Sequence, residues 1–542
     1  MGGDDGHHSV LVAGGHLVGR RSGAVLQRIP RRGRRLIVAG AADHGAGANS
    51  EAVTDPRDLS GRRVLVAGGR VSGRALLPTL DALGAQVTVA DSDEAALAAC
   101  ADLGADTVSM DRIAPDRAAV AEFALVITSP GFRPDAPLLT TALTVGVPVW
   151  GDIEFSWRVD RAEVHGPART WLVVTGTNGK TTTTSMLASI LEASGRPSQA
   201  CGNIGVPVLD ALRSESPRAE VLAVELSSFQ LFWAPSVRPA AGVVLNIAAD
   251  HLDWHGGMDA YVEAKLQALR GDVAVVGLDD AVASSLRSRA TAPRTVGFTA
   301  GRPSAGDLGV EDGMLVDRAF GDGVPLVSSA EIEPPGPAGL QDALAASALA
   351  RAAGVDADSV ARGLAAFRVG PHRAATVREL GGVRFVDDSK ATNPHAARSS
   401  ILAHERVVWL AGGLLKGAEV DDLVAEVRSR LAAAVVFGRD GEAIAAALGR
   451  HAPDVPVVHV PPGDDASVAD ETDVTNGDQV MTLAVRAAAH RAEPGTTVLL
   501  APSTASFDQF RDYGHRGDSF TAAVADLTEA DLGTGTRPGN AG

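Results

Sequence analysis

The chain has 542 residues, of which 45% are hydrophobic, and a formal net charge of −17 at pH 7. This length favours three or four domains, and the acidic balance argues against a nucleic acid as the main partner. A mean hydropathy of +0.08, with no run of about 18 apolar residues, argues against membrane insertion. Two cysteines and the absence of a basic start before an apolar, cleavable segment indicate a cytoplasmic protein without disulfides, which we expect to be a monomer.

The first 55 residues are rich in glycine and arginine and contain the basic cluster RIPRRGRR at 28–35. A copy of VLVAGG occurs at 10–15, but no complete βαβ unit follows it. We therefore predict a flexible N-terminal extension over 1–55.

A regular α/β pattern begins at Arg62. VLVAGG (64–69) is typical of a strand, 71–83 of a helix capped by Gly84, and QVTVAD of a second strand ending at Asp91. ALVITSPG (124–131) indicates a further strand that runs into a loop. This alternation predicts a Rossmann-like N-terminal domain over 56–165.

Two further α/β units follow. TWLVVTGTNGKTTTT (170–184) predicts a strand, a glycine-rich loop and a helix, and strands at 220–225 and 241–247 complete a P-loop ATPase-like central domain over 166–370. Alternation resumes near Pro371 and predicts a Rossmann-like C-terminal domain over 371–527, with a loop at 464–473 and a disordered tail over 528–542. The predicted fold class is α/β, with three domains in series.

The loop at 176–181 reads GTNGKT and differs from the common P-loop pattern, because glycine stands at 176 and not at 174. Backbone N–H groups and the following helix start could still hold phosphates, with Lys180 near the β/γ oxygens and the Thr181 hydroxyl on Mg²⁺. The alternative is an ordinary strand–helix turn with an exposed lysine. We favour phosphate binding because lysine is scarce: Lys180, Lys265, Lys390 and Lys416 are the only lysines in the chain.

Two acidic or imidazole groups follow the next strands. Glu225 ends VLAVEL, and His251 stands in DHLD after VVLNIAA. Either residue alone could be structural. Their place at the carboxyl ends of strands beside a nucleotide loop favours a functional role.

Lys265 lies in YVEAKLQALR (261–270), within the apolar stripe of a predicted helix over 258–269. It could snorkel to solvent, but arginine does this as well and is used almost everywhere else in the chain. Burial would lower the pKa of the amine and leave it nucleophilic. A role that needs an amine is therefore favoured: a Schiff base, a proton acceptor, or carbamylation by CO₂.

Seven sequence elements occur in a fixed order: GTNGKTTT (176–183), CGNIGVP (201–207), VELSSFQL (224–231), NIAADHLDWHG (246–256), EAKLQ (263–267), PHR (371–373) and DDSKATNP (387–394). This ordered set resembles the Mur ligases, over about residues 60–525. The resemblance implies an ATP-dependent amide ligase that works in cytoplasmic peptidoglycan precursor synthesis through an acyl-phosphate intermediate.

The resemblance also implies the residues that bind ATP and metal. Lys265 is expected to be carbamylated and to hold one Mg²⁺ with His251, while Thr181 and Glu225 serve a second. The expected ATP contacts are Gly176, Thr177, Asn178, Gly179, Lys180, Thr181, Thr182, Arg373 and Asp388. The expected catalytic residues are Lys180, Glu225, His251, Lys265, Asp388 and Lys390.

The first domain is expected to bind the uridine nucleotide of the substrate. Arg70 occupies the second glycine position of a dinucleotide-binding G-x-G-x-x-G motif, which makes a role with NAD doubtful. By resemblance, the nucleotide site consists of Ser72, Asp91, Ser92, Ser129, Gly131 and Asn203. A serine in such a loop, taken singly, could equally be a loop residue without a ligand.

The C-terminal elements are similar to those of family members that add D-glutamate to UDP-N-acetylmuramoyl-L-alanine. The implied D-glutamate contacts are Thr392, Lys416, Ser506, Phe507 and Tyr513, and a lysine with hydroxyls suits two carboxylates. No DNPR-type motif of the diaminopimelate- or lysine-adding members occurs. Gln341-Asp342 stands where the family commonly shows His-Asn, which leaves a contact to adenine or ribose in doubt there.

Three rival functions remain. Another Mur ligase or a folylpolyglutamate synthase is disfavoured by the SFDQF segment and the missing DNPR motif. A dinucleotide-dependent oxidoreductase is disfavoured by Arg70 and by the loop at 176–181. A non-catalytic nucleotide-binding regulator is disfavoured because each of the four lysines has an expected role.

Overall fold

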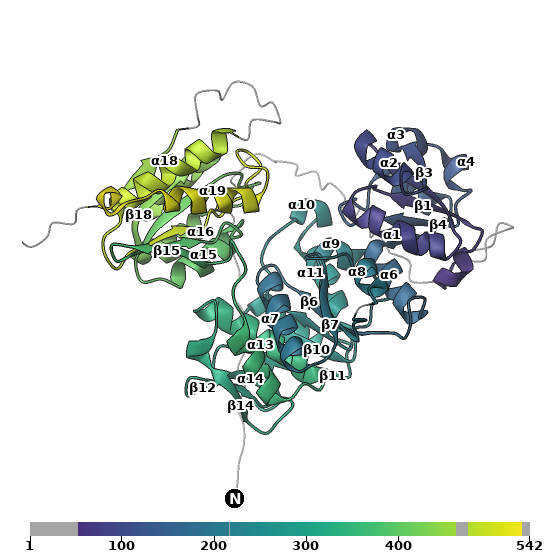
Figure 1. Ribbon diagram of the computed structural model, residues 1–542, viewed down its shortest axis with the longest axis horizontal. Coiled ribbons are helices and arrows are strands. Elements are labelled where there is room, and N and C mark those ends of the chain that lie inside the picture. Colours follow the sequence, from purple (N-terminus) through teal and green to yellow (C-terminus); the bar gives the residue numbers. More distant parts are fainter. Residues whose placement is uncertain (1–52, 216, 462–474, 534–542) are drawn as a thin grey trace, which may run out of the picture. The chain divides into compact units, whose positions relative to one another are not determined.

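The computed structural model of the protein describes residues 53–215, 217–461 and 475–533. The strands form three separate sheets, and each sheet falls within one of the three predicted domain ranges (Figure 1). Within these residues, no helix combines the length and hydropathy needed to cross a membrane.

The first sheet has five parallel strands in the order β3-β2-β1-β4-β5. The order reverses at β1, so the loops after β1 and β4 meet at the switch point where α/β sheets bind ligands. The elements are η1 (Pro56–Leu59), β1 (Arg63–Ala67), α1 (Val71–Ala82), β2 (Gln86–Asp91), α2 (Glu94–Ala101), β3 (Asp106–Ser109), α3 (Met110–Ile113), α4 (Arg117–Val120), β4 (Leu125–Thr128), α5 (Pro137–Thr144), β5 (Val149–Gly151) and α6 (Asp152–Arg161).

The second sheet has nine strands in the order β14-β13-β12-β11-β10-β9-β6-β8-β7. Strands β6 to β12 are parallel, whereas β13 and β14 pair antiparallel at one edge. Because β6 lies between β8 and β9, the loops that follow these three strands share one edge of the sheet.

The central strands are β6 (Thr170–Thr175), β7 (Ser198–Gly202), β8 (Val221–Glu225), β9 (Ala241–Val244), β10 (Val273–Gly277), β11 (Arg294–Phe298), β12 (Asp307–Glu311), β13 (Met314–Asp317) and β14 (Val324–Ser328). The helices are α7 (Lys180–Ala193), α8 (Val208–Arg213), α9 (Ser228–Phe232), α10 (Leu252–His255), α11 (Met258–Leu266), η2 (Gln267–Leu269), α12 (Ala281–Ser285), η3 (Leu286–Ser288), η4 (Ser329–Glu331), α13 (Pro337–Ala352) and α14 (Ala357–Ala366).

The third sheet has six strands in the order β15-β16-β20-β17-β18-β19, and only β15 is antiparallel to its neighbour. Both faces are buried, because Val408 and Leu410 of β17 pack into one hydrophobic cluster and Val407 and Trp409 into another. The elements are β15 (Ala375–Leu380), β16 (Val383–Asp387), α15 (Pro394–Leu402), β17 (Val407–Gly412), α16 (Asp421–Val427), η5 (Arg428–Arg430), β18 (Leu431–Phe437), α17 (Gly441–His451), β19 (Val457–His459), α18 (Thr475–Arg491), β20 (Thr497–Leu500), α19 (Tyr513–Ala525) and η6 (Glu529–Asp531).

Most predicted elements occur where the pattern placed them, with shorter ends. The helix predicted over 258–269 is α-helical to Leu266 and continues as the 3-10 turn η2. The stretch between that helix and residue 369, for which no element is predicted, contains the five strands β10 to β14 and the helices α13 and α14. Helix α13 gave no amphipathic signal because eight consecutive residues, 343 to 350, are buried.

The folded chain extends beyond two predicted boundaries. Val53, inside the predicted extension, is buried in the hydrophobic cluster that contains Val64 and Val66 of β1, and Asp55 caps η1. At the other end, Leu532 packs into the third core, so residues 528–533 are part of the fold and not of a tail. The rest of the extension (1–52), the predicted loop at 464–473 and residues 534–542 lie outside the described residues.

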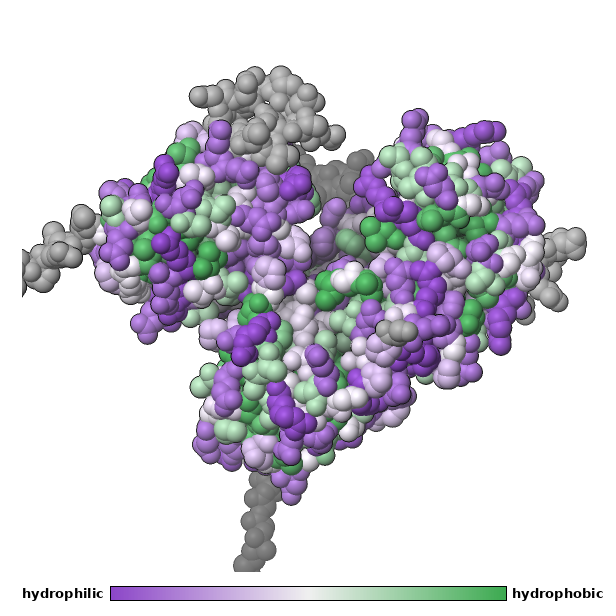
Figure 2. Space-filling view, in the orientation of Figure 1, coloured by the Kyte–Doolittle hydropathy of each residue, from purple (hydrophilic) through white to green (hydrophobic). Residues whose placement is uncertain are grey.

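Exposed large hydrophobic side chains are few in the described part of the chain, and hydrophobic residues on the face in Figure 2 form small groups among hydrophilic ones. Phe507 and Tyr513, two predicted acceptor contacts, are among these exposed side chains, at 66% and 37% exposure. Val71, which is 64% exposed, lines a cavity described below. Exposed apolar side chains therefore coincide in part with predicted binding positions.

Candidate active site

The GTNGKT segment connects β6 to α7. Gly179 has a left-handed φ of 83°, and a Cβ atom there would lie 2.2 Å from Oδ1 of Asp342, so only glycine fits. The Nζ atom of Lys180 donates to the carbonyl oxygens of Gly176 at 3.0 Å and Thr177 at 2.9 Å. A helix that starts directly after such a turn presents backbone N–H groups suited to phosphate.

Side chains that follow β9 support this loop. The backbone N–H of Asn178 donates to Oδ1 of Asn246 at 2.8 Å, and Nδ2 of Asn246 donates back to the carbonyl of Asn178 at 3.2 Å. The hydroxyls of Thr177 and Tyr261 are 2.9 Å apart. Asn246 and Tyr261 were not predicted as site residues, although both stand in the quoted motifs or beside one.

Lys180 is surrounded by charges from several elements. Burial lowers its pKa, an effect that Glu225 and Asp250 oppose and that Lys390 and Arg373 reinforce. The predicted residues Glu225, Lys390 and Arg373 are thus close enough to Lys180 to influence it electrostatically, as is Asp250, which was not predicted. Thr181 and Thr182 are half-buried in the first turn of α7.

Lys265 is buried, as the apolar stripe predicted. Lys265 is only 2% exposed, and its Nζ atom donates a hydrogen bond to the carbonyl of Gly176 at 2.7 Å. The amine also lies 4.8 Å from the ring centre of Tyr261. Burial, reinforced by Lys180, holds the pKa of Lys265 well below its ordinary value. The snorkelling alternative is therefore excluded, because the amine points at the phosphate loop and not at solvent.

Glu225 ends β8 with its carboxylate buried. Glu225 is 1% exposed, and its Oε1 atom accepts a hydrogen bond from Nδ2 of Asn203 at 2.9 Å. Oε2 is buried and has no hydrogen-bond partner among the described residues. Leaving a carboxylate oxygen buried and unpaired is costly, so this atom is suited to a cation.

His251 precedes α10 and has a left-handed φ of 53°. Its ring centre lies 4.7 Å from that of Phe229, and Nε2 is 3.4 Å from Oδ2 of Asp250. Burial lowers the pKa of His251, so the neutral imidazole can act as a ligand at neutral pH.

The site fits Mg²⁺ through the unpaired oxygen of Glu225. In the described ranges, no three His, Cys, Asp or Glu residues are grouped so as to hold a metal ion. A cation here would therefore need other donors, such as the Thr181 hydroxyl or a modified Lys265.

Four of the predicted C-terminal residues form two pairs, each of a lysine amine and an aromatic ring. Nζ of Lys390 is 3.9 Å from the ring centre of Tyr513, and Nζ of Lys416 is 5.4 Å from that of Phe507. Ser506 is 2% exposed, beside the exposed Phe507. The remaining residues, Thr392, Arg373 and Asp388, are half-buried, and burial raises the pKa of Asp388 to about 6.

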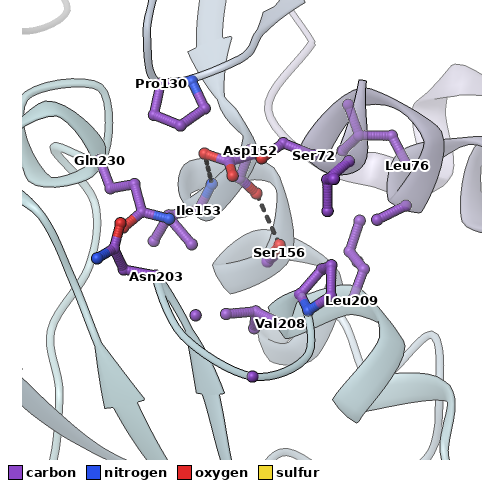
Figure 3. A pocket seen from close by; sticks show the side chains of 15 residues that line it. Ser72, Leu76, Pro130, Asp152, Ile153, Ser156, Asn203, Val208, Leu209 and Gln230 are labelled. Atoms are coloured by element: carbon purple, nitrogen blue, oxygen red, sulfur yellow. Dashed lines mark hydrogen bonds between the residues drawn. The ribbon is translucent and has the colours of Figure 1, made fainter. Parts of the chain in front are cut away.

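The predicted nucleotide residues divide between two cavities. Ser72 and Asn203 line a cavity of about 180 Å³, together with Asp152 and Gln230 (Figure 3). Asp91, Ser129 and Gly131 line another of about 280 Å³, together with Arg70. Ser92 is exposed and lines neither of these two cavities.

Asp152 and Gln230 are site candidates that sequence reasoning missed. Asp152 directly follows β5, its Oδ1 accepts from the N–H of Ile153 at 2.9 Å, and Ser156 donates to its carbonyl at 2.6 Å (Figure 3). Burial raises the pKa of Asp152 to about 6. The available signal was its position after a strand in WGDIEF, the same signal that singled out Glu225.

Asp342 is turned toward the phosphate loop. Oδ1 accepts a hydrogen bond from the Thr183 hydroxyl at 2.9 Å and lies against Gly179. Its neighbour Gln341 instead donates to Oδ2 of Asp279 at 3.0 Å. Burial raises the pKa of Asp342 to about 8, so the carboxyl group is largely protonated at neutral pH.

We expect Asp342→Asn to raise thermal stability at pH 8 but not at pH 4. The folded state keeps a proton that the unfolded state loses between pH 3.8 and about 8, so Asp342 destabilises the fold increasingly through that window. A neutral amide removes this penalty and can still accept from Thr183. A Tm rise of roughly 2–4 °C per kcal/mol recovered would appear in melting curves at the higher pH. Equal Tm differences at both pH values would contradict this assignment.

Two stretches of the chain match models of Mur ligase domains. The Mur ligase middle domain matches residues 174–314, and the Mur ligase glutamate ligase domain matches residues 372–504. The UDP-N-acetylmuramoylalanine–D-glutamate ligase of Rhodococcus jostii is 66% identical over 472 residues, covering 85% of this chain and 95% of the relative. The chain belongs to the Mur ligase family.

Other Mur ligases support the same placement. The UDP-N-acetylmuramoylalanine–D-glutamate ligase of Nocardia farcinica is 60% identical, covering 85% of this chain and 96% of the relative. The ligase of the same name from Mycobacterium avium is 57% identical, covering 84% of this chain and 95% of the relative. The solved UDP-N-acetylmuramate–alanine ligase of Thermotoga maritima aligns with a TM-score of 0.52 at 18% identity, over 86% of this chain and 99% of that chain. This last likeness concerns the fold alone. The family resemblance drawn from the motifs is confirmed, whereas the roles of individual residues stay predictions.

Proposed function

We propose that this Mur ligase joins D-glutamate to UDP-N-acetylmuramoyl-L-alanine, forming ADP and phosphate from ATP, in peptidoglycan precursor synthesis. One observation of the structure supports the chemistry: a phosphate loop flanked by the half-buried amine of Lys180, the buried amine of Lys265 and the half-unpaired carboxylate of Glu225. The choice of D-glutamate is supported by relatives named UDP-N-acetylmuramoylalanine–D-glutamate ligase, which are 54–66% identical to this chain.

The first step activates a carboxylate, which is itself a poor electrophile. An oxygen of the L-alanine carboxylate bonds to the γ-phosphorus of ATP, the bond to the β-phosphate oxygen breaks, and ADP leaves. Lys180 neutralises phosphate charge at the loop, and Lys390 and Arg373 would add positive charge from the third domain.

Bound Mg²⁺ supplies charge neutralisation at the β- and γ-phosphate oxygens. Two sites suit the donors present: Thr181 with Glu225, and His251 with a carbamylated Lys265. The carbamate forms when the neutral amine of Lys265 bonds to the carbon of CO₂ and releases one proton. The lowered pKa of Lys265 favours the neutral amine that this reaction needs.

The second step forms the amide. The amine of D-glutamate attacks the acyl-phosphate carbon, the amine loses a proton, and the tetrahedral intermediate collapses with release of phosphate. Lys416, Thr392 and Ser506 would bind the two carboxylates, beside the rings of Phe507 and Tyr513.

The uridine nucleotide would occupy the two cavities. Their polar linings, Asp91, Ser129 and Gly131 in one and Ser72 and Asn203 in the other, supply donors and acceptors at the switch point of the first sheet and beside it. Ser92 adjoins Asp91 and is open to a ligand that crosses this edge.

The test is phosphate release from ATP with UDP-N-acetylmuramoyl-L-alanine and a series of amino acids. We expect turnover with D-glutamate and background rates with L-glutamate, L-lysine and diaminopimelate. Turnover with L-lysine or diaminopimelate in place of D-glutamate would overturn the proposed specificity. Nucleotide-dependent reduction of a cofactor without phosphate release would instead favour the oxidoreductase rival.

A further inference from the structure

Arg516 is a fully buried arginine whose hydrogen bonds go to neutral groups. It lies in the first turns of α19 and is 0% exposed. Nε donates to Oγ of Ser389 at 3.0 Å, and Nη2 donates to the carbonyls of Ser389 at 2.9 Å and Thr504 at 3.1 Å. Nη1 reaches the carbonyl of Gly412 at 3.4 Å. In the part of the chain that the structure describes, Arg516 forms no salt bridge.

The three residues that Arg516 contacts belong to three different loops. Ser389 follows β16, Gly412 ends β17, and Thr504 follows β20, and these are adjacent strands in the order β16-β20-β17. One guanidinium group thus spans the carboxyl ends of three neighbouring strands.

Each of these loops carries a predicted site residue close to the contact. Lys390 directly follows Ser389, Ser506 is two residues after Thr504, and Lys416 is four residues after Gly412. The carbonyl groups that Arg516 holds therefore lie one to four residues from the side chains expected to bind the acceptor amino acid and the phosphoryl group.

Further hydrogen bonds connect these loops to α19 and to one another. The Ser389 hydroxyl donates to the carbonyl of Tyr513 at 2.7 Å, and the Thr504 hydroxyl donates to the carbonyl of Gly412. Gly517 permits close approach of α19, because a Cβ atom there would lie 2.0 Å from Nδ1 of His372. The loops and the helix start form one connected hydrogen-bond network.

We propose that Arg516 is a positioning residue for the amino-acid acceptor, which fixes the loops bearing Lys390, Lys416 and Ser506 relative to one another. This inference rests on the proposed function only for the identity of that acceptor. The planar guanidinium has five N–H donors in a fixed fork, so it can hold three loops at once. A lysine would keep the charge but, with one ammonium group, could not reach all four oxygens.

The decisive measurement compares KM values in Arg516→Lys with those in the unchanged enzyme. We expect the KM for the acceptor to rise at least about tenfold and kcat to fall, as for other residues that orient ligands through a second residue. The KM for the uridine nucleotide substrate should stay within about twofold, since its predicted site lies outside these loops.

Arg169→Lys is the matched control. Arg169 is also buried, at 2% exposure, and donates to Oδ1 of Asp160 at 3.1 Å and to the carbonyl of Leu212 at 2.6 Å, away from the three loops. It should lower Tm without a selective change in the acceptor KM. If Arg516→Lys behaves like this control, with a lower Tm and no selective KM change, the proposal is wrong.

Ser389→Ala decides the matter if Arg516→Lys does not fold. It removes the contact to Nε of Arg516 and the hydrogen bond to the carbonyl of Tyr513 with little loss of volume. Each hydrogen bond of ordinary strength corresponds to a rise of about 2–10-fold in the acceptor KM. An unchanged acceptor KM in this variant would overturn the proposal. If the unchanged enzyme uses an amino acid other than D-glutamate, the proposed function fails separately, and the same KM comparison is made with that acceptor.

Discussion

We expect Lys265→Arg to lower kcat by about 100- to 1,000-fold, the range seen when an electrostatic contact to a reacting group is lost. The positive charge is kept, but the Lys265 amine occupies a closed position 2.7 Å from the carbonyl of Gly176 and 4.8 Å from the Tyr261 ring. A guanidinium is larger than this position allows, and it cannot form a carbamate with CO₂. Steady-state phosphate release at saturating substrates measures the effect, and a fully active Lys265→Arg enzyme would contradict the carbamate.

Chemical rescue separates the carbamate from a purely positive role. We expect Lys265→Ala to regain part of its activity with added formate or acetate, because a short carboxylate can enter the space left by the side chain. Lys180→Ala is the matched control, since Lys180 is half-buried beside the same loop, where its Nζ also donates to the carbonyl of Gly176, but is expected to act as a cation. Rescue of both variants, or of neither, would argue against carbamylation, and ¹³C-bicarbonate labelling followed by NMR detects the adduct directly.

We expect Glu225→Gln to lower kcat by at least about 100-fold and to raise the Mg²⁺ concentration needed for half-maximal activity. The reason is the buried Oε2 atom, which has no hydrogen-bond partner in the described residues. In the glutamine variant an amide NH₂ group takes the place of one carboxylate oxygen, and this group donates hydrogen bonds and cannot bind a cation. Titration of activity with Mg²⁺ at saturating ATP measures both effects.

Stability measurements provide the control for Glu225→Gln. Without Mg²⁺ the variant should melt at or above the Tm of the unchanged protein, because a neutral amide is less costly to bury than an unpaired carboxylate. Addition of Mg²⁺ and ADP should raise the Tm of the unchanged protein more than that of the variant. An equal rise in both would exclude Glu225 as a metal contact.

The phosphate loop, Glu225 and the burial of Lys265 were predictable because their signals are local. A strand, a glycine turn and a helix start lie within fifteen consecutive residues at 170–184, and the stripe around Lys265 within twelve. The sequence could also indicate which residues lie at the carboxyl ends of strands, since parallel strands bring those ends to one edge.

Helix α13 was not predicted, for a related reason. Alternation of polar and apolar residues reveals an element only when one face meets solvent, and residues 343–350 of α13 are buried on all sides. Tertiary packing thus removed the pattern on which the prediction depended.

The sequence by itself determined the family and the α/β class, and it predicted phosphate and acceptor loops whose roles stay predictions. Only the tertiary structure decided that Asp342 faces Gly179, that Asp152 and Gln230 share a cavity with Ser72, and that Arg516 holds three loops. These contacts join residues up to 163 positions apart in the case of Asp342 and Gly179, so no spacing in the chain encodes them. The three loops meet at Arg516 because the order of strands in the third sheet brings them to the same edge, whereas Asp342 is placed by the packing of α13 against α7.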